Sequence, residues 1–349
     1  MAIRYIGSKT RLADHIIDIV KASSKPTGRF IDAFGGTGVV ASRAADNGFS
    51  VVVNDMLASS SVISEAKLIS SHQAAFDSFG SADEVFAHLN SLDSTDGYIY
   101  RTYSPASSEF CEHERRYFSK ENAAKIDAVR SEIQQLFDCK RINRSEMTVL
   151  LASLLTAANH VANTAGTYGC FLRRWTPNAL KPLLLEPVEL RETDIDYEVV
   201  TGDVFELNTK WEDSVYLDPP YTKRQYASYY HIAETICMGD SPVVQGVAGL
   251  RPWKDKASPF CYKTKALDAL MRCARELNSK NLFFSYSNQG HVALDEFVAG
   301  LKRFGLVEVC SLGEIGRYRP NKTASKAGSQ VEEYLICLSK SDEFRRGTD

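Results

Sequence analysis

One short segment of this 349-residue chain combines residue types suited to chemistry, Asp218-Pro219-Pro220-Tyr221. Exocyclic amino nitrogens are poor nucleophiles because their lone pair is delocalised into the ring, so a catalyst must hold their N–H groups with acceptors. The Asp218 carboxylate and the Pro219 carbonyl can be those acceptors, and proline adds no competing N–H donor. Tyr221 can stack on a planar base. The set is therefore typical of methylation of an amino group.

A glycine-rich loop earlier in the chain has the character of a cofactor site. It lies between an expected strand and an expected helix and reads Asp32-Ala-Phe34-Gly-Gly36-Thr-Gly38. Glycine lets the backbone approach a ligand, and a helix N-terminus adds positive potential. The loop also satisfies the dinucleotide pattern G-x-G-x-x-A, with Asp55 near the expected ribose-binding position. The loop alone leaves open a dinucleotide, another adenosine-bearing cofactor or a purely structural turn.

The charge of Asp32 distinguishes between these ligands. An acidic residue just before the loop would repel a pyrophosphate, yet it would attract the α-ammonium of S-adenosylmethionine. Asp55 can accept two hydrogen bonds from ribose hydroxyls in either case, and its structural alternative is a turn residue or a helix N-cap. The pattern therefore favours S-adenosylmethionine over a nicotinamide dinucleotide.

Seven short apolar runs predict the strands that position these residues, at 29–34, 50–54, 197–204, 214–217, 281–285, 306–310 and 333–338. Helical patterns at 39–47, 267–277 and 294–304 separate several of the runs. Strands alternating with helices predict an α/β fold with a mostly parallel sheet. The last two runs are joined by a Gly- and Lys/Arg-rich segment, which predicts an antiparallel hairpin at one edge.

A long segment between the second and third runs has a different character. Helical patterns dominate residues 57–193, most clearly at 123–137 and 146–159. We therefore expect a mainly helical insertion at 57–193, with residues 1–56 and 194–349 forming the catalytic domain.

Composition limits the class of protein. Apolar residues make up 44% and charged residues 24%, as in folded globular proteins. No apolar stretch approaches the roughly 20 residues that span a bilayer, and the N-terminus lacks a signal region, so we expect no membrane association and a cytoplasmic location. Eight cysteines and seven histidines have no metal-like spacing, so we expect reduced thiols and no metal. The net charge of −3 excludes a globally basic nucleic-acid binder but leaves local basic patches open.

The order of cofactor loop, insertion and Asp218-Pro-Pro-Tyr221 resembles that of the Dam-like adenine-N6-specific DNA methyltransferases of restriction-modification type. Arg4-Tyr5-Ile-Gly7-Ser-Lys9 is similar to the family's N-terminal motif, in which an aromatic residue and a lysine contact the methionine part of the cofactor. Gly202-Asp203-Val-Phe205 is similar to its adenine-contacting G-D-F motif, except that Val204 intervenes. Arg224-Gln-Tyr226 is similar to a subset of the restriction-modification enzymes.

The resemblance implies a Rossmann-like methyltransferase sheet and transfer from S-adenosylmethionine to adenine N6, releasing S-adenosylhomocysteine without a metal. The implied cofactor contacts are Tyr5, Lys9, Asp32, Phe34, Gly36, Gly38, Asp55, Asp203 and Asp218. The implied catalytic residues are Asp218, Pro219, Pro220 and Tyr221. The partner would be double-stranded DNA, from which the target adenine must be flipped out of the stack.

Two segments are candidates for gripping the DNA. The first, 159–175, combines amide, aromatic and guanidinium groups in a glycine-containing loop, with Tyr168, Arg173 and Arg174 as the expected contacts. Its arginines could instead simply face solvent. The second candidate is the basic segment between the last two runs, with Arg317 and Arg319, which could equally be a solvated hairpin loop.

Other functions remain open at this point. Cytosine N4, RNA or a protein glutamine could be the methyl acceptor, but those relatives more often carry Ser or Asn at the position of Asp218. A catalytically silent DNA-binding regulator would be expected to have a degraded motif. A nicotinamide oxidoreductase leaves Asp218 to Tyr221 without a role. The sequence leaves open the recognised DNA word, the oligomeric state and whether a cognate restriction endonuclease exists.

Overall fold

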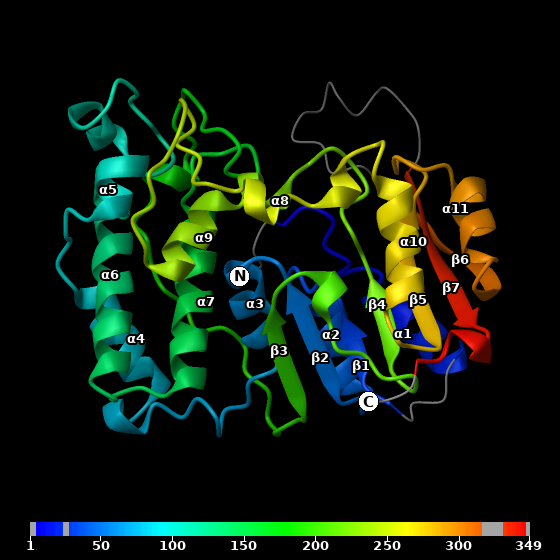
Figure 1. Cartoon of the computed structure of the whole chain (residues 1–349). Coiled ribbons are helices and arrows are strands. Elements are labelled where there is room, and N and C mark those ends of the chain that lie inside the picture. Colours follow the sequence, from blue (N-terminus) through cyan, green and yellow to red (C-terminus); the bar gives the residue numbers. More distant parts are fainter. Residues whose placement is uncertain (1–4, 24–27, 316–330, 347–349) are drawn as a thin grey trace. The chain divides into compact units, whose positions relative to one another are not determined.

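A computed structural model describes residues 5–23, 28–315 and 331–346. Its contacts divide the chain into two units (Figure 1). The helical unit comprises Met1–Gly7, Leu57–Ile195 and Ala227–Lys256, and the sheet unit comprises Ser8–Met56, Asp196–Tyr226 and Ala257–Asp349. The helical unit thus takes in 1–7 and 227–256, which the sequence placed with the sheet.

The sheet unit contains seven strands in the order β3-β2-β1-β4-β5-β7-β6. Their bounds are β1 Phe30–Asp32, β2 Val51–Asp55, β3 Tyr197–Thr201, β4 Ser214–Leu217, β5 Asn281–Ser287, β6 Gly305–Ile315 and β7 Val331–Lys340. The first five strands pair in parallel, while β7 pairs antiparallel with both β5 and β6. The predicted mostly parallel, Rossmann-like sheet with an antiparallel edge pair is confirmed.

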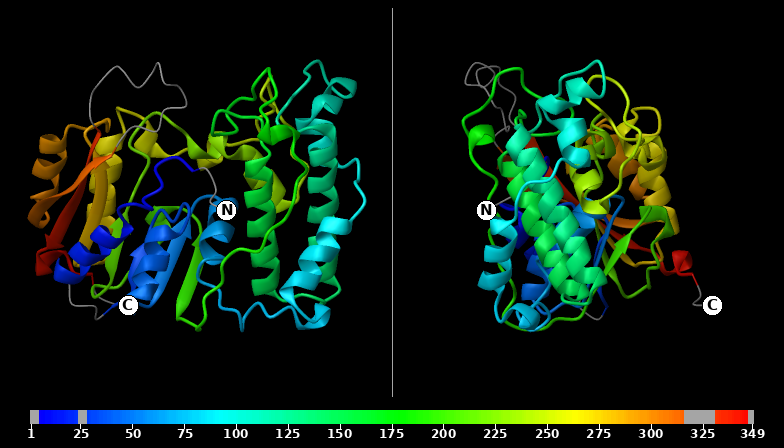
Figure 2. Two further views of the ribbon diagram at one scale, coloured as in Figure 1. Left: turned by 180° about the vertical axis from the view of Figure 1, so that it is seen from behind. Right: turned by 90° about the vertical axis from the view of Figure 1, so that its left-hand side faces the viewer.

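Helices cover both faces of this sheet, because its central strands are apolar on both sides. One face carries α10 (Ala266–Glu276) and α11 (Leu294–Leu301), seen in front in Figure 1. Leu270 and Phe297 of these helices share a buried cluster with Ile31 and Val215 of the strands. The other face carries α1 (Ala13–Ser23) and α2 (Val39–Asp46), seen from behind in Figure 2.

The strand order reverses direction between β1 and β4. In open α/β sheets, ligands bind outside the carboxyl ends of the strands at such a switch point. The glycine-rich loop leaves β1 at this edge, and Asp218 follows β4 at the same edge. Two of the predicted motifs, far apart in the sequence, therefore meet.

The helical unit is built around two long helices that run side by side, α6 (Lys120–Asp138) and α7 (Arg144–His160) (Figures 1 and 2). Asn143 and Glu146 form a reciprocal capping box that starts α7. The other helices are α3 Ala58–Glu65, α4 Ala82–Ser91, α5 Tyr98–Tyr103, α8 Tyr226–Tyr229 (whose first residue belongs to the sheet unit) and α9 His231–Met238.

Within the described ranges, no helix is long and apolar enough to cross a membrane. Among the described residues, no cluster of three or more His, Cys, Asp or Glu side chains could hold a metal ion. All eight cysteines are free thiols.

Candidate active site at the carboxyl edge of the sheet

The loop after β1 has the backbone geometry expected of a ligand-binding turn. Gly36 and Gly38 have φ angles of 53° and 70°, a region in which a side chain is strained. The N–H of Ala33 donates to the Tyr216 carbonyl at 2.9 Å, and the N–H of Gly35 donates to the Asn54 carbonyl at 2.8 Å. These bonds tie the loop to β4 on one side and to β2 on the other. Gly38 is also the N-cap of α2, so the loop lies at a helix N-terminus.

The two acids assigned to the adenosine part of a cofactor lie at neighbouring strand ends. Asp55 ends β2, and its Oδ2 accepts a 2.9 Å hydrogen bond from the Gly36 N–H. The Gly202 N–H donates to the Asp55 carbonyl at 3.0 Å. Next to it, the Asp203 carboxylate accepts from the Phe205 N–H at 3.1 Å and caps a short 3-10 helix. The structure therefore brings Gly36, Asp55 and Asp203 together, and their contacts with a ligand stay a prediction.

An aromatic group lies beside this edge. Phe34 and Phe205 each pack on Phe260, with ring centroids 5.5 and 5.9 Å apart, respectively. Val204, which interrupts the G-D-F-like motif, is buried in the core, so the aromatic position moves along by one residue. Phe260 was missed by the sequence analysis because no local pattern marks it, and it joins the group only through packing.

Asp32 is a buried carboxyl at the end of β1. Its side chain is 2% exposed, and its Oδ1 accepts a 3.4 Å hydrogen bond from the Phe34 N–H. Burial, reinforced by the negative charge of Asp218, raises the pKa of Asp32 to about 8. The carboxyl is therefore mostly protonated at neutral pH, and a cation placed beside it would favour the ionised form.

A buried lysine faces Asp218. Lys9 is 5% exposed, and its Nζ lies 3.4 Å from Asp218 Oδ1 and 3.0 Å from Glu333 Oε2. Burial lowers the pKa of Lys9, but the two carboxylates outweigh it and the net direction is upward, so the ammonium stays charged. Burial raises the pKa of Asp218 to about 6 against the opposing effect of Lys9. At neutral pH Asp218 is therefore a largely ionised hydrogen-bond acceptor.

Tyr221 is held at both ends. Its Oη donates to Glu333 Oε1 at 3.1 Å, and its carbonyl accepts from the His291 N–H at 3.0 Å. The ring packs edge-on against Tyr286, with centroids 5.8 Å apart. Glu333, on β7, was not found from the sequence. A signal was present, because Glu333 alternates with buried Leu335 and so belongs to an inward face of the strand.

Comparison with known sequences assigns this site to a family. Residues 5–293 match the profile described as D12 class N6 adenine-specific DNA methyltransferase. The chain belongs to this family. The match includes the glycine-rich loop and Asp218 to Tyr221 but ends before Glu333. The resemblance drawn from the sequence is thereby confirmed.

Three bacterial methyltransferases align with nearly the whole chain. "Modification methylase LlaI" of Lactococcus lactis subsp. lactis is 37% identical, over 99% of this chain and 56% of that protein. "Type II methyltransferase M.NlaIII" of Neisseria lactamica is 33% identical, over 97% and 99%, respectively. "Type II methyltransferase M.FokI" of Planomicrobium okeanokoites is 31% identical, over 97% and 53%. The chain thus spans about half the length of the LlaI and FokI methylases and nearly all of the NlaIII enzyme.

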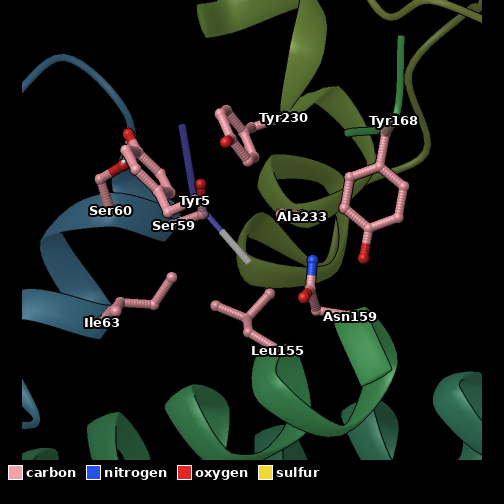
Figure 3. Close-up of a pocket in the computed structure, with 9 residues that line it drawn as sticks. All are labelled: Tyr5, Ser59, Ser60, Ile63, Leu155, Asn159, Tyr168, Tyr230 and Ala233. Atoms are coloured by element: carbon pink, nitrogen blue, oxygen red, sulfur yellow. Dashed lines mark hydrogen bonds between the residues drawn. The ribbon is translucent and has the colours of Figure 1, made fainter. Parts of the chain in front are cut away.

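Two further predicted residues of this D12-family chain line a small pocket in the helical unit (Figure 3). Tyr5 stacks on Tyr230 with ring centroids 4.5 Å apart, and its Oη lies 3.1 Å from Ser60 Oγ. Tyr168 and Asn159 lie on the opposite wall of the pocket. The predicted cofactor contact Tyr5 and the predicted DNA contact Tyr168 therefore belong to one pocket of the helical unit.

Tyr168 is a packing residue in this unit. It is 2% exposed, and its carbonyl accepts hydrogen bonds from Tyr117 Oη at 3.0 Å and His231 Nε2 at 2.9 Å. The rings of Tyr117 and Phe118 pack against its own ring. Its ring thus contributes to the core of the helical unit.

Arg173 and Arg174 are both exposed. Arg116 approaches them, because its Nη1 donates to the Arg173 carbonyl at 2.9 Å while its Nε pairs with Glu114. Their contact with DNA stays a prediction. The second predicted pair, Arg317 and Arg319, lies outside the described residues.

Proposed function

We propose that this protein transfers a methyl group from S-adenosylmethionine to the N6 amino group of adenine in double-stranded DNA. The observation that carries the proposal is the ionised acceptor Asp218 at the carboxyl end of β4, beside the glycine-rich loop that follows β1. Membership of the D12 family supports adenine as the base.

The residues at this edge fit S-adenosylmethionine. The positive φ angles of Gly36 and Gly38 leave backbone free of side chains where an adenosine could approach. Asp55 and Asp203 offer acceptors for ribose hydroxyls and for the adenine amino group. The buried Asp32 carboxyl would hold the α-ammonium. Bound there, S-adenosylmethionine would supply an electrophilic methyl group and leave as S-adenosylhomocysteine as the new N–C bond forms, while one amine proton would pass by way of Asp218 to solvent.

The protein side of the reaction is the holding of the target amine. The Asp218 carboxylate and the Pro219 carbonyl accept from its two N–H groups, which draws the nitrogen lone pair out of conjugation with the ring. Lys9 keeps Asp218 ionised, so the carboxylate acts as an acceptor near neutral pH. Tyr221 offers its ring as a stacking surface for the base.

The target adenine must leave the duplex to reach such an edge, at a cost of a few kcal/mol. We propose that the helical unit grips the surrounding DNA, with Arg173 and Arg174 contacting phosphates or base edges. Their exposure supports this role. We further propose that the protein is the modification partner of a restriction endonuclease, because the LlaI relative is described as a modification methylase.

The test is product analysis. The purified protein is incubated with methyl-labelled S-adenosylmethionine and unmethylated duplex DNA, which is then digested to nucleosides and analysed by mass spectrometry. N6-methyldeoxyadenosine is expected, and it should be missing with Asp218→Ala. Label in N4-methylcytosine, RNA or protein glutamine, or no transfer at all, contradicts the proposal. Single-molecule sequencing of DNA from a methyl-free host then reports the recognised word.

A further inference from the structure

Glu333 joins two parts of the candidate site that are far apart in the sequence. Its carboxylate accepts from Lys9 Nζ through Oε2 at 3.0 Å and from Tyr221 Oη through Oε1 at 3.1 Å. Both oxygens are therefore engaged, and the residue is only 5% exposed. A buried carboxylate is costly unless it is paired and hydrogen-bonded, so this arrangement is specific.

We propose that Glu333 is a positioning residue for methyl transfer, which fixes the Tyr221 ring and shares the Lys9 ammonium with Asp218. This inference rests on the proposed function. Glu333 lies beyond the segment that defines the family match, and it reaches the site from β7.

The first part of the role is mechanical. The backbone of Tyr221 is anchored by the His291 N–H, and Tyr286 contacts the edge of its ring. The hydroxyl bond to Glu333 fixes the far end of the side chain, and the Lys9 ammonium, itself paired with Glu333, lies 5.7 Å from the centroid of the ring. A stacking surface is useful only in one orientation, because small misplacements of bound reactants are costly in rate. Glu333 therefore sets where a base can stack.

The second part of the role is electrostatic. Lys9 lies closer to Glu333 than to Asp218, at 3.0 Å against 3.4 Å. If the Lys9 ammonium paired with Asp218 alone, it would occupy the carboxylate oxygen that must accept from the amine. Because Lys9 is also paired with Glu333, the Asp218 carboxylate remains available to the amine. Within the described residues, the groups that also face Asp218 or act on it include Asp32 on β1, Tyr216 on β4, Ser285 on β5 and Tyr221 itself. None of these is a second cation, so Glu333 governs how much of the Lys9 charge Asp218 experiences.

The test compares four single variants and one double variant, Glu333→Leu with Tyr221→Phe, in single-turnover methylation of duplex DNA across a pH series. Glu333→Leu removes the charge and the acceptor, Glu333→Gln keeps an acceptor for Tyr221, and Tyr221→Phe removes the donor. Glu332→Gln is the matched control, because Glu332 is the exposed neighbour on the same strand. Circular dichroism and thermal unfolding verify folding, and calorimetry measures the affinity for S-adenosylmethionine.

We expect Glu333→Leu to lower the transfer rate by about 10- to 100-fold. Glu333→Gln should recover part of that loss. The acid side of its pH–rate profile should move to lower pH, because Asp218 loses a like-charged neighbour and its pKa falls. The double variant Glu333→Leu with Tyr221→Phe should lose little more of the transfer rate than the more severe of the two single variants, because the two side chains act as a unit.

Each contrary outcome has a distinct meaning. If the wild type methylates adenine while both Glu333 variants match Glu332→Gln, the role of Glu333 is refuted and the proposed function stands. Fully additive losses, or an acid limb unmoved in a folded Glu333→Gln variant, refute the positioning role as well. A wild type that leaves adenine unmethylated refutes the proposed function and this inference with it.

Discussion

Replacing Asp32 by Asn should remove most of the pH dependence of S-adenosylmethionine binding. Burial and the neighbouring Asp218 hold the pKa of Asp32 at about 8 in the free protein. Pairing with the α-ammonium of the cofactor requires the ionised carboxylate. Below pH 8 a proton must therefore leave Asp32 as the cofactor binds, and binding should be tighter at higher pH.

The size of the effect follows from the pKa of Asp32. With a free pKa of about 8 and a carboxylate that is ionised throughout this range when the cofactor is bound, the dissociation constant should fall by about tenfold per pH unit, or about 30-fold between about pH 5.5 and pH 7. The cofactor ammonium stays protonated over this range, because α-amino groups titrate at about 7.7 to 8.0. About one proton should be released per cofactor bound near pH 6.5.

The assay is isothermal titration calorimetry in two buffers with different ionisation enthalpies, which yields the affinity and the number of protons released. Asp32→Asn should show neither the steep slope nor the proton release. Asp218→Asn is the matched control, because the pKa of Asp218, about 6, also lies in this range. The pH dependence should persist in that variant but move to lower pH, because Asp32 loses a like-charged neighbour.

Unfolding offers an independent readout of the same group. The pKa of Asp32 is raised in the folded state, so its contribution to the unfolding free energy is full below its unfolded value and is lost as pH rises towards about 8. The ligand-free wild type should therefore lose melting temperature from pH 5 to pH 8 more steeply than Asp32→Asn. A wild-type affinity that is flat with pH, or an equal slope in Asp32→Asn, would refute the reasoning.

Four further substitutions test the assigned roles. Asp218→Ala should lower transfer by about 100-fold or more while the fold survives, because Lys9 keeps its bond to Glu333; a folded variant with over a tenth of the wild-type rate contradicts this. Asp55→Ala should weaken cofactor binding by about 1.5 to 3 kcal/mol per lost hydrogen bond, with turnover at saturation better preserved; an unchanged calorimetric dissociation constant removes Asp55 from the site. Arg173→Ala and Arg174→Ala should each cost about 1 to 3 kcal/mol of DNA-binding free energy and relax the preference for one base if the arginine reads a guanine. If the arginine binds a phosphate, the slope of log K against log salt concentration should shrink by about one. A double variant that binds DNA like the parent at several salt concentrations places both arginines on an ordinary surface.

Local patterns were sufficient for the framework of the site. Strand periodicity, the positive-φ glycines at 36 and 38 and the Asp218-Pro-Pro-Tyr221 segment are each encoded within a few consecutive residues. The rules for parallel sheets explain why the sheet was predicted, and they place the ends of β1 and β4, with the motifs that follow them, at a common edge.

Burial was decided by the tertiary structure, because it depends on chain segments that are distant in the sequence. The sequence analysis relied on the negative charge of Asp32 to attract an α-ammonium, yet Asp32 is 2% exposed and mostly protonated at neutral pH. The same applies to Tyr168, an apparent loop residue that packs in a core. Glu333 lies 324 positions from Lys9 in the sequence, so only the pairing of β7 with the sheet could bring their charges together.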